Sequence, residues 1–503
     1  MDELNDFADP ATDATSSHDV IDFAGPRAEP DSPVKPIIVV SNRIPGKRPA
    51  AGGLAVALKK VLGERQGFWF GWSGGFSEDY TDEAQFSTID GLRIGGLDLP
   101  EKDYHGYYEG FANSVLWPAF HHRLDLIKIA EEDYDAYCRV NEAFAKALIN
   151  EASPEHTIWV HDYHLIPLGR ELRRLGAKNR IGFFLHIPFP GPEIFSAVPH
   201  SADLLSALAA YDLVGLQAQR DVEKLKTQFE SATLPSVSDQ TQAPPEFLPH
   251  SVDAFPIGTD PQAFRQLVGR PRAMRSEEQM VASLAGRALI LGIDRLDYSK
   301  GLPERIAAYD KLLEKFPKWR RRVHMLQIAP SSRDTIEQYR DISEALDLAC
   351  GRLMGRFAEP DWAPINYVKR AYPQTALAGL YRAAHVALVT PLRDGMNLVA
   401  HEFLACQDPE DPGVLVLSRF AGAAELFAEA LLVNPHNIEE TADALDQALA
   451  MSLKERKARW VACMEMVERH DVDHWAGDFL GRLADVPPWD AKMGKVQSGD
   501  KAD

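Results

Sequence analysis

A short turn in the last third of the chain has the residue types to bind a ligand that carries phosphate and hydroxyl groups. Arg393, Asp394 and Gly395 lie between an apolar run at 385–390, typical of a buried strand, and a predicted helix at 398–405. A helix that begins at the carboxyl end of a parallel strand suits a phosphate, because its first backbone amides are unpaired. An ordinary strand-to-helix loop with a solvated aspartate is the alternative interpretation.

Two cations and a further acid could serve the same ligand. Arg295 and Lys300 follow another apolar run at 288–293, which predicts them at a second strand end. A guanidinium fork and an ammonium point charge together suit a diphosphate, although a solvated basic loop would have the same pattern. Glu402 lies one turn inside the predicted helix, far enough from Asp394 to reach a different part of a long ligand.

The first half of the chain has polar residues at strand ends of its own. Arg43 follows an apolar run at 37–40, and Asp162 and His186 each follow a predicted strand. Because ligands of open α/β sheets bind outside the carboxyl ends of the strands, we expect Asp162 and His186 to face one cleft. A glycine pair that ends at Gly53 opens a predicted helix and would let an anion approach the backbone closely.

Histidines and aromatic residues in the first half give weaker signals. His161 and His164 have H-x-x-H spacing but lack the helical H-E-x-x-H frame, so no metal site is expected. Trp72, Tyr108 and Trp117 belong to stretches that are rich in aromatic residues. Such residues more often form the core than contact a ligand, but sugar rings present C–H faces that stack on tryptophan and tyrosine.

The elements that must position these residues alternate as strands and helices, which indicates an α/β fold with two βα halves, each parallel. Further strands are predicted at 68–75, 158–160, 181–185, 212–217, 324–329, 413–417 and 431–435, and further helices at 54–62, 165–175 and 302–316. We also expect a loop or an irregular hairpin at 232–249, a helical basic segment at 261–285, and two closing helices before a polar tail from about residue 485. Polar sites that face each other across a cleft fit a transferase with a phosphate-linked donor.

Composition is that of an ordinary globular protein, with 45% hydrophobic and 25% charged residues among 503. The net charge of −20 argues against non-specific nucleic-acid binding, and no apolar run is long enough to span a membrane. The cysteines are scattered without disulfide or zinc spacing, which fits a reduced cytoplasm. They are Cys138, Cys350, Cys406 and Cys463.

The N-terminal segment differs from the rest in composition. In residues 1–36, nine acids oppose Arg27 and Lys35, which gives a charge of about −7 (2 − 9). Few of its side chains could contribute to a core, so we predict a disordered acidic tail at 1–35. A docking segment is the alternative.

Several long motifs make the chain similar to a known enzyme family. They are SNRIP, AGGLAVAL, FGWSG, YYEGFANSVLWPAFHHRLDL, WVHDYHL, IGFFLHIPFP, DRLDYSKGLPER, PLRDGMNLVAHEF, GVLVLSRFAGAA and VNPH. In one continuous order over residues 36–483, they resemble the retaining trehalose-6-phosphate synthases of glycosyltransferase family 20. The resemblance implies a GT-B fold with two Rossmann-like domains. Its implied parts are an acceptor-binding domain at 36–255, a nucleotide-sugar-binding domain at 256–470, a helix at 471–485 that crosses back to the first domain, and a flexible tail at 486–503.

The resemblance implies transfer of glucose from UDP-glucose to glucose 6-phosphate with retention, which gives α,α-trehalose 6-phosphate and UDP. Arg295 and Lys300 would hold the donor diphosphate, where leaving-group charge develops, and would act as electrostatic catalysts. Asp394 would bind a donor hydroxyl, His186 would contact the donor glucose near the reacting carbon, and Glu402 would bind the ribose. The implied catalytic residues are Arg295, Lys300, His186 and Asp394.

The resemblance also implies the residues of each substrate site. The donor-binding set is Gly53, His186, Arg295, Lys300, Asp394, Gly395, Met396, Asn397, Leu398 and Glu402. The acceptor-binding set is Arg43, Trp72, Tyr108, Trp117, Asp162 and Arg333. In the acceptor set, Arg43, Tyr108, Trp117 and Arg333 would surround the phosphate, and Trp72 and Asp162 would contact the sugar. The family is thought to use front-face transfer without an enzyme nucleophile, and it needs no metal or other cofactor, so none is expected here.

The expected partners are the two small-molecule substrates, with no nucleic acid and no membrane, in a cytoplasmic homo-oligomer that is a dimer or a tetramer. Two features depart from the family pattern: His401 replaces a more frequent lysine, and segment 351–357 is a degraded version of an INGxYG-like stretch. Two alternatives remain. A glucosylglycerol-phosphate synthase would use glycerol 3-phosphate, which Trp72 and Trp117 disfavour, and a catalytically silent sugar-phosphate sensor would have no need for Lys300.

Overall fold

The computed structural model describes residues 35–45, 53–233, 251–331, 337–487 and 489. Several predictions therefore concern residues outside the described ranges. These residues are 1–34 of the acidic tail, 234–249 of the predicted loop, Arg333, and all of the tail at 486–503 except 486, 487 and 489.

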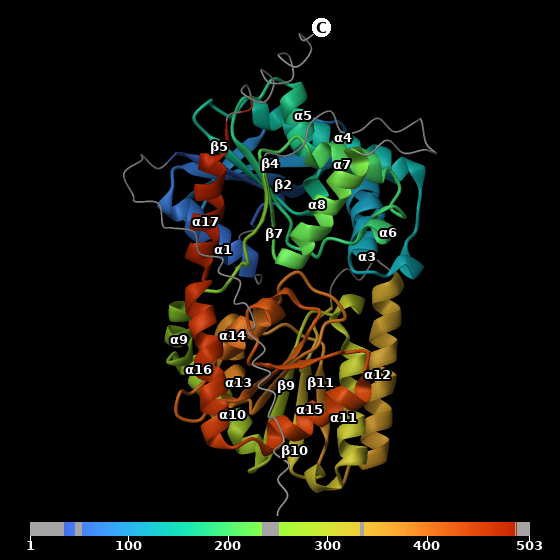
Figure 1. Cartoon of the computed structure of the whole chain (residues 1–503), viewed down its shortest axis with the longest axis vertical. Coiled ribbons are helices and arrows are strands. Elements are labelled where there is room, and N and C mark those ends of the chain that lie inside the picture. Colours follow the sequence, from blue (N-terminus) through green and yellow to red (C-terminus); the bar gives the residue numbers. More distant parts are fainter. Residues whose placement is uncertain (1–34, 46–52, 234–250, 332–336, 488, 490–503) are drawn as a thin grey trace, which may run out of the picture. The chain divides into compact units, whose positions relative to one another are not determined.

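Within the described ranges, the first sheet has eight strands in the order β3-β4-β2-β1-β5-β6-β7-β8 (Figure 1). They are β1 (Ile37–Arg43), β2 (Gly67–Ser77), β3 (Gln85–Ile89), β4 (Leu92–Pro100), β5 (Thr157–His161), β6 (Ile181–Phe184), β7 (Leu213–Leu216) and β8 (Ser251–Ala254). Neighbouring strands are parallel except for β3 and β4, which are antiparallel. The prediction of an all-parallel first half is therefore wrong at this edge.

A tight turn explains the antiparallel pair. Asp90 and Gly91 connect β3 to β4, and both have positive φ, at 53° and 81°. An Asp-Gly pair in this conformation makes the two-residue turn of a β-hairpin, whereas parallel neighbours need a long crossover. The dipeptide was a readable signal in the sequence for this hairpin.

The second sheet is parallel throughout the described ranges, with six strands in the order β11-β10-β9-β12-β13-β14. They are β9 (Ala288–Ile293), β10 (Val323–Ile328), β11 (Ile365–Val368), β12 (Val386–Val389), β13 (Val414–Ser418) and β14 (Leu431–Val433). All of these strands were predicted except β11. The sequence does not reveal β11 because it is a four-residue edge strand that is only partly buried.

Helices flank both sheets. They are α1 (Gly53–Glu64), α2 (Glu101–Tyr104), α3 (Trp117–Phe120), α4 (Glu131–Ile149), α5 (Leu168–Arg174), α6 (Pro192–Phe195), α7 (Ser201–Leu208), α8 (Gln219–Thr233), α9 (Pro261–Val268), α10 (Pro271–Leu284), α11 (Leu302–Lys315), α12 (Glu337–Phe357), α13 (Gln374–Ala383), α14 (Leu398–Cys406), α15 (Ile438–Ala450), α16 (Leu453–Arg469) and α17 (Val472–Asp485). A π-helix, η1 (His105–Leu116), and short 3₁₀ turns at Leu124–Leu126, Tyr163–Leu165, Tyr298–Lys300, Pro317–Trp319 and Gly422–Glu425 complete the set. No helix in the described part of the chain is both long and apolar enough to span a bilayer.

Two helical regions are divided more finely than predicted. Segment 261–285 is two helices, because α9 ends at Val268 with Gly269 as its C-cap, and α10 begins at Pro271. Three helices rather than two follow β14, and each starts at a side-chain cap. Asn437, Ser452 and Asp471 accept hydrogen bonds from backbone amides in the first turns of α15, α16 and α17.

The last helix, α17, packs on the first sheet, as predicted for the crossing helix. The rings of Trp475 and Phe479 each lie 4.8 Å from the ring of Trp159 on β5. A Cβ atom on Gly182 or Gly215 would lie 2.7 Å from the Phe479 ring, so the close approach of α17 requires glycine at both strand positions. Figure 1 shows α17 in red beside α1.

Packing continues past the end of α17. Val486 is buried, and Arg180 donates a hydrogen bond to its carbonyl oxygen (2.5 Å). The guanidinium of Arg173 lies 4.3 Å from the ring centroid of Trp489. The first residues of the predicted tail at 486–503 are therefore part of the packed structure.

Both faces of each sheet are buried at its central strands. On β1, Ile37 and Val39 join one hydrophobic cluster, Ile38 and Val40 join the other, and each is at most 1% exposed. Burial on both faces explains why these strands read as continuous apolar runs. The described residues from Lys35 onward form one compact unit.

Candidate active site

The turn after β12 is held by its own side chains. Asp394 accepts hydrogen bonds from Asn397 Nδ2 (3.0 Å) and from Lys300 Nζ. The Lys300 and Asp394 side chains are 13% and 15% exposed, so water screens their attraction less than that of a surface pair. Asn397 has a φ of 82° and precedes α14, where a helix N-terminus offers unpaired amides.

The loop after β9 is tied to this turn. Asp297, which is fully buried, accepts hydrogen bonds from the backbone N–H and hydroxyl of Ser299 (3.0 and 2.9 Å). The carbonyl of Ser299 accepts one from Leu392 N–H (2.8 Å). Gly301 has a φ of 62°, and a Cβ there would lie 2.4 Å from the Thr390 carbonyl oxygen, so glycine is required where the loops meet. The structure therefore brings Lys300 together with the predicted Asp394, and Arg295 lies earlier in the same loop.

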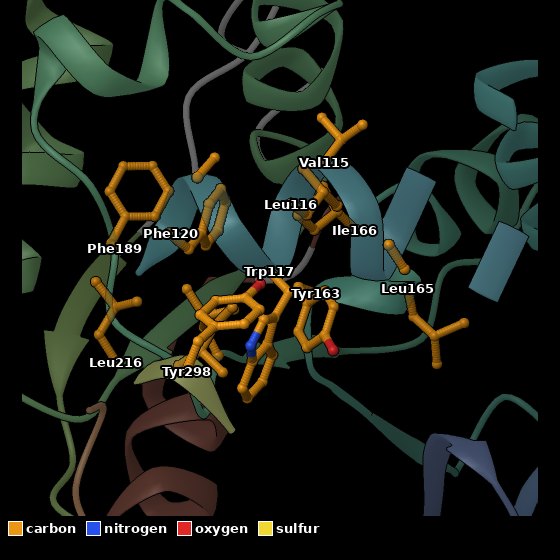
Figure 2. Close-up of a cluster of buried hydrophobic side chains, with 14 of the residues drawn as sticks. Val115, Leu116, Trp117, Phe120, Tyr163, Leu165, Ile166, Phe189, Leu216 and Tyr298 are labelled. Atoms are coloured by element: carbon orange, nitrogen blue, oxygen red, sulfur yellow. The ribbon is translucent and has the colours of Figure 1, made fainter. Parts of the chain in front are cut away.

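Arg295 has surroundings unlike those of Lys300. Its side chain is 42% exposed and lies 3.6 Å from Asp297. Its guanidinium carbon lies 4.8 Å from the ring centroid of Trp117, which belongs to the first half. Figure 2 shows Trp117 in a buried cluster with Tyr163 of the first half and Tyr298 of the second. Arg295 is thus the more accessible of the two cations, whereas Lys300 is held by an acid.

Glu402 lies one turn into α14 and has a partner that the sequence did not indicate. The buried hydroxyl of Tyr381, on α13, donates a hydrogen bond to its carboxylate (2.8 Å). Burial raises the pKa of Glu402 to about 7, although the tyrosine hydrogen bond opposes this rise. Glu402 therefore has a different hydrogen-bond partner from Asp394, and its reach to a different part of a long ligand stays a prediction.

The two halves meet at the backbones of His186 and Gly395. A Cβ on Gly395 would lie 2.0 Å from the His186 carbonyl oxygen, so a side chain there would force the loops apart. A Cβ on Gly422, after β13, would lie 1.8 Å from the Gly395 carbonyl oxygen. The sequence indicated that Gly395 could offer a backbone amide to a ligand. That the contact between the loops also requires glycine at this position follows only from the fold.

The His186 ring belongs to a neutral hydrogen-bonded chain. Gln217 accepts from Ile257 N–H (2.9 Å) through its oxygen, so its amide nitrogen faces His186 Nδ1 (3.3 Å) and donates to it. His186 Nε2 then carries the proton and faces His161 Nδ1 (3.1 Å). Burial lowers the pKa of His186 to about 3 and lowers that of His161 as well. His161, noted in the sequence only for metal spacing, orients His186 instead.

Asp162 meets His186 at the predicted edge. Its carboxylate accepts a hydrogen bond from His186 N–H (3.3 Å), and its own φ is 77°. A positive φ at a residue other than glycine is uncommon and stores strain that often occurs at functional sites. Asp162 and His186 are therefore in contact at the carboxyl ends of the neighbouring strands β5 and β6, and that both face one cleft stays a prediction.

Three of the predicted acceptor residues of the first half, Arg43, Trp72 and Tyr108, are linked through aromatic rings. Arg43 lies 5.0 Å from the ring centroid of Trp72, and Trp72 lies 4.4 Å from Tyr104. Tyr104 stacks on Tyr108 (5.3 Å), which in turn stacks on His164 (5.6 Å). Tyr104 was not predicted as a site residue. It lies four residues before Tyr108, so the two side chains project from the same helical face. His164, which the sequence marked only for a possible metal spacing, therefore packs in this aromatic stack.

Local helix geometry presents these aromatic residues. Tyr108 lies in the π-helix η1, and Trp117 directly follows it. A π-helix of this length is rare, and such segments are frequent at functional sites. Trp72 and Trp117 are each 5% exposed and belong to the hydrophobic core, so each is a core residue with a guanidinium against its ring.

One residue without a predicted role lies near the donor loops. His121 is buried on the turn after α3, and its Nδ1–H donates to the Trp117 carbonyl (2.7 Å). Burial lowers the pKa of His121 to about 4, while Asp297 and Asp394 act in the opposite direction. Its Nε2 is therefore left as an acceptor. The sequence shows His121 only within a run of basic residues, without spacing that marks a ligand.

The remaining predicted residues are placed as follows. Gly53 is the first residue of α1, Leu398 is the first residue of α14, and Met396 is buried with its carbonyl accepting from Ala423 N–H (3.0 Å). Arg333 lies outside the described residues, so its role stays a prediction. In the described ranges, no three histidine, cysteine or acidic side chains are grouped so that they could hold a metal ion.

The model of glycosyltransferase family 20 matches residues 41–485. The chain belongs to glycosyltransferase family 20. Its two parallel-sheet domains and returning helix are the GT-B fold.

Relatives and solved structures agree with this membership of family 20. A trehalose-6-phosphate synthase of Sodalis glossinidius is 43% identical over 469 residues, which cover 92% of this chain and 99% of the relative. A crystal structure of a UDP-forming α,α-trehalose-phosphate synthase from Burkholderia xenovorans in complex with glucose 6-phosphate has a TM-score of 0.83 at 43% identity, and covers 90% of this chain and 100% of its own. A structure from E. coli bound with UDP-2-fluoro glucose has a TM-score of 0.83 at 41% identity, with coverages of 90% and 100%.

The two departures from the family 20 pattern lie in packed helices. His401 on α14 is fully buried, and its ring lies 4.7 Å from that of Phe427. Burial lowers the pKa of His401 to about 3, so this position carries no charge next to Glu402. Segment 351–357 forms the last turns of α12. Neither departure removes a residue of the network around Asp394.

Proposed function

We propose that this protein transfers glucose from UDP-glucose to glucose 6-phosphate with retention of configuration, and so forms α,α-trehalose 6-phosphate and UDP. Membership of family 20, at 43% identity to a trehalose-6-phosphate synthase over nearly the whole chain, supports this proposal. Solved relatives bound with glucose 6-phosphate and with UDP-2-fluoro glucose support both substrates.

The observation that carries the proposal is the convergence of loops from both sheets at Gly395. This residue adjoins the Lys300–Asp394 pair on its own side and the His186 backbone on the other. A donor that lies along the second-sheet loops would therefore present its reacting carbon to first-half residues. Placement of two reactants in one site removes much of the entropic cost of their encounter.

Lys300 and Arg295 are assigned to the donor diphosphate. Departure of UDP builds negative charge on the phosphate oxygens, and cations fixed beforehand stabilise that charge without reorganisation. Asp394 holds Lys300 in place, and its carboxylate has capacity for a sugar hydroxyl as a further donor. Arg295 is exposed enough to meet a ligand directly.

His186 acts through its backbone in this proposal. Both of its ring nitrogens face first-half partners, Gln217 and His161, so the ring is fixed and neutral. Its carbonyl oxygen faces the Gly395 loop and is an acceptor for a donor hydroxyl near the reacting carbon. His121, with Nε2 as an acceptor, is a further candidate contact on the same side.

The acceptor phosphate is assigned to Arg43, with Arg333 as its predicted second ligand. A guanidinium matches the geometry of a phosphate dianion, and Arg43 is exposed at the end of β1 beside Trp72. Asp162, held by His186 N–H, is assigned to an acceptor hydroxyl. Tyr108 and Trp117 border the same region. Glu402, steadied by Tyr381, is assigned to the ribose of the donor.

We propose further that the reaction uses no metal ion or other cofactor, since arginine and lysine supply the charge that meets the diphosphate. We expect a homo-oligomer, which light scattering on a sizing column would measure. We expect a cytoplasmic enzyme, and the four cysteines are free thiols, as fits a reducing compartment.

Product identification tests the proposal. Purified protein would be incubated, with and without a chelator, with UDP-, ADP- or GDP-glucose and with glucose 6-phosphate, glycerol 3-phosphate or glucose. We expect α,α-trehalose 6-phosphate from UDP-glucose and glucose 6-phosphate, unchanged by the chelator. A glucosylglycerol phosphate product would instead indicate the alternative synthase, and binding without turnover of any pair would indicate a sensor.

A further inference from the structure

A cavity lies at the opposite edge of the second sheet from the donor loops. Its volume is about 480 Å³, within the usual range of small-molecule sites, and the segments before β9, β10, β11 and β12 line it. The β9 strand has six residues, so the cavity lies about 17 Å along the strand from the loop that holds Arg295. The proposed reaction uses none of its lining residues.

The lining is cationic in a protein of opposite charge. Arg287, Arg321 and Arg322 line the cavity with Asp361 as the acid, which gives a local charge of +2 (3 − 1) where the whole chain has −20. Arg287 is fixed, because it donates to the carbonyl oxygens of Leu284 (3.1 Å) and Asp361 (3.0 Å). A local charge of +2 equals the opposite charge of one phosphate monoester dianion.

Neither Arg321 nor Arg322 makes a contact with another described residue that would contribute much to the stability of the fold. Arg321 pairs with Asp361, but the two side chains are 59% and 62% exposed, and such surface pairs stabilise little. Its backbone has a φ of 65°, a conformation that costs free energy for a bulky residue and often occurs at ligand sites. Arg322 makes no side-chain hydrogen bond or ion pair with any residue in the described ranges.

Neutral groups complete the wall. His385 Nδ1 accepts a hydrogen bond from Leu289 N–H (3.2 Å), so in the neutral ring Nε2 carries the proton and is a donor. The indole N–H groups of Trp319 and Trp362 are occupied by Asp446 and by the Val323 carbonyl. The two rings therefore contribute apolar surface, and they also provide local reporters of ligand binding.

We propose that this cavity is a binding site for a small phosphate monoester, separate from the proposed catalytic cleft. Arg322 and Arg321 supply forks for the phosphate oxygens, Arg287 supplies fixed charge, and His385 supplies a neutral donor. The ring of Trp319 borders the group esterified to the phosphate. Inorganic phosphate would bind the same groups without the contact to Trp319.

Fluorine NMR of the full chain labelled with fluorotryptophan tests this proposal. Trp319→Phe and Trp362→Phe would assign the two reporter signals, and Trp72 and Trp117 would report on the cleft. Inorganic phosphate, glucose 6-phosphate and unphosphorylated glucose would be titrated separately. We expect both phosphates, but not glucose, to shift the reporter signals until they saturate at low millimolar concentration, with tighter binding for the ester.

Charge variants decide whether the arginines are responsible. We expect Arg322→Glu to weaken phosphate binding at the reporters by about tenfold or more. Arg320→Gln removes a neighbouring cation that does not line the cavity, so it should leave binding unchanged. Arg43→Ala, which alters only the proposed catalytic cleft, should also leave the reporter titration unchanged.

Several results would overturn the proposal. They are shifts confined to Trp72 and Trp117, shifts that grow linearly with phosphate and never saturate, or unchanged binding in Arg322→Glu. Arg322 is exposed, so this variant should fold, and Arg287→Gln offers a second test of the same site. Failure here would leave the proposed transfer reaction untouched, because product formation is measured independently of these signals.

Discussion

The loops at the carboxyl edges of the two sheets hold their polar residues by different means. In the second half, Lys300 and Asp394 form an ion pair that is largely shielded from water. In the first half, His161 and His186 form a chain of neutral rings, since burial lowers the pKa of both. The second half therefore provides fixed charges that can interact with a charged ligand, whereas the first half holds neutral side chains in fixed positions.

This difference matches the chemistry of the proposed transfer. The leaving group gains negative charge in the transition state, and fixed cations lower the barrier most where charge develops. The acceptor sugar is neutral apart from its phosphate, and the proposed ligand of that phosphate, Arg43, is exposed at the end of β1. Substitution of the second-half cations Lys300 and Arg295 should therefore change turnover, whereas substitution of Arg43 in the first half should change acceptor affinity.

The largest expected effect is that of Lys300→Ala. We expect kcat to fall by about a hundredfold to a thousandfold, because loss of one preorganised charge costs roughly 3 kcal/mol of barrier. Initial rates with saturating substrates would measure it, and circular dichroism would verify the fold. Arg295→Ala should have an effect of the same order.

Lys311→Ala is the matched control, since it removes a half-exposed lysine from ion pairs with Glu314 and Glu439 in the second half. It should leave kcat within about twofold, as surface pairs contribute little. Near-normal turnover in both Lys300→Ala and Arg295→Ala would contradict the assignment of charge stabilisation to the second half.

Arg43→Ala should raise the KM for glucose 6-phosphate by roughly tenfold to a hundredfold, because a charged hydrogen bond is worth about 1.5–3 kcal/mol. UDP affinity, measured by calorimetry, should change little. Unphosphorylated glucose should be a poor acceptor for the wild type and no worse for the variant. If the variant still prefers glucose 6-phosphate over glucose as strongly as the parent, Arg43 is structural and the phosphate binds elsewhere.

Tyr381→Phe tests whether the hydrogen bond from Tyr381 to Glu402 helps Glu402 to bind the donor. Loss of a hydrogen bond worth about 0.5–1.5 kcal/mol should raise the KM for UDP-glucose by roughly twofold to tenfold, with the KM for glucose 6-phosphate unchanged. Tyr309→Phe is the control, because that buried hydroxyl donates to the Pro364 carbonyl (2.9 Å) and borders no substrate in the proposal. Equal changes in both KM values would show that Tyr381 acts only on the fold.

The smallest expected effect is the pH dependence of stability that Glu402 causes. Its pKa is raised to about 7, so its contribution to stability is present below the ordinary glutamate pKa and is lost as pH rises through about 7. Glu402→Gln cannot ionise, so its Tm relative to wild type should rise by several degrees between about pH 5 and about pH 8.

Glu439→Gln is the control for this titration. Glu439 is an exposed glutamate whose pKa is lowered by its hydrogen bond to Lys311, so its replacement should not produce such a rise. Melting curves at matched ionic strength would measure both variants. A Tm difference for Glu402→Gln that is constant across this range would show that Glu402 is already ionised at low pH.

The local sequence pattern was sufficient to predict features that depend only on residues close together in the chain. The apolar runs of β1, β9 and β12 identified buried strands, because both faces of a parallel sheet exclude water. The strand-turn-helix order around Asp394 placed that turn at the edge of the sheet. The missed hairpin at Asp90 and Gly91 was equally local and could have been predicted from its dipeptide.

The choice of partners was decided only in three dimensions. The sequence by itself determined which residues follow strands, which residues are charged, and, through long motifs, the family. It did not determine that Lys300 pairs with Asp394, that Trp117 lies under Arg295, or that three arginines line one cavity. The first two contacts, and the approach of Arg287 to the other two arginines, join residues far apart in the chain, and strand order and loop packing bring them together. Periodicity describes only the few residues within one element, so the tertiary structure alone decides which loop ends meet.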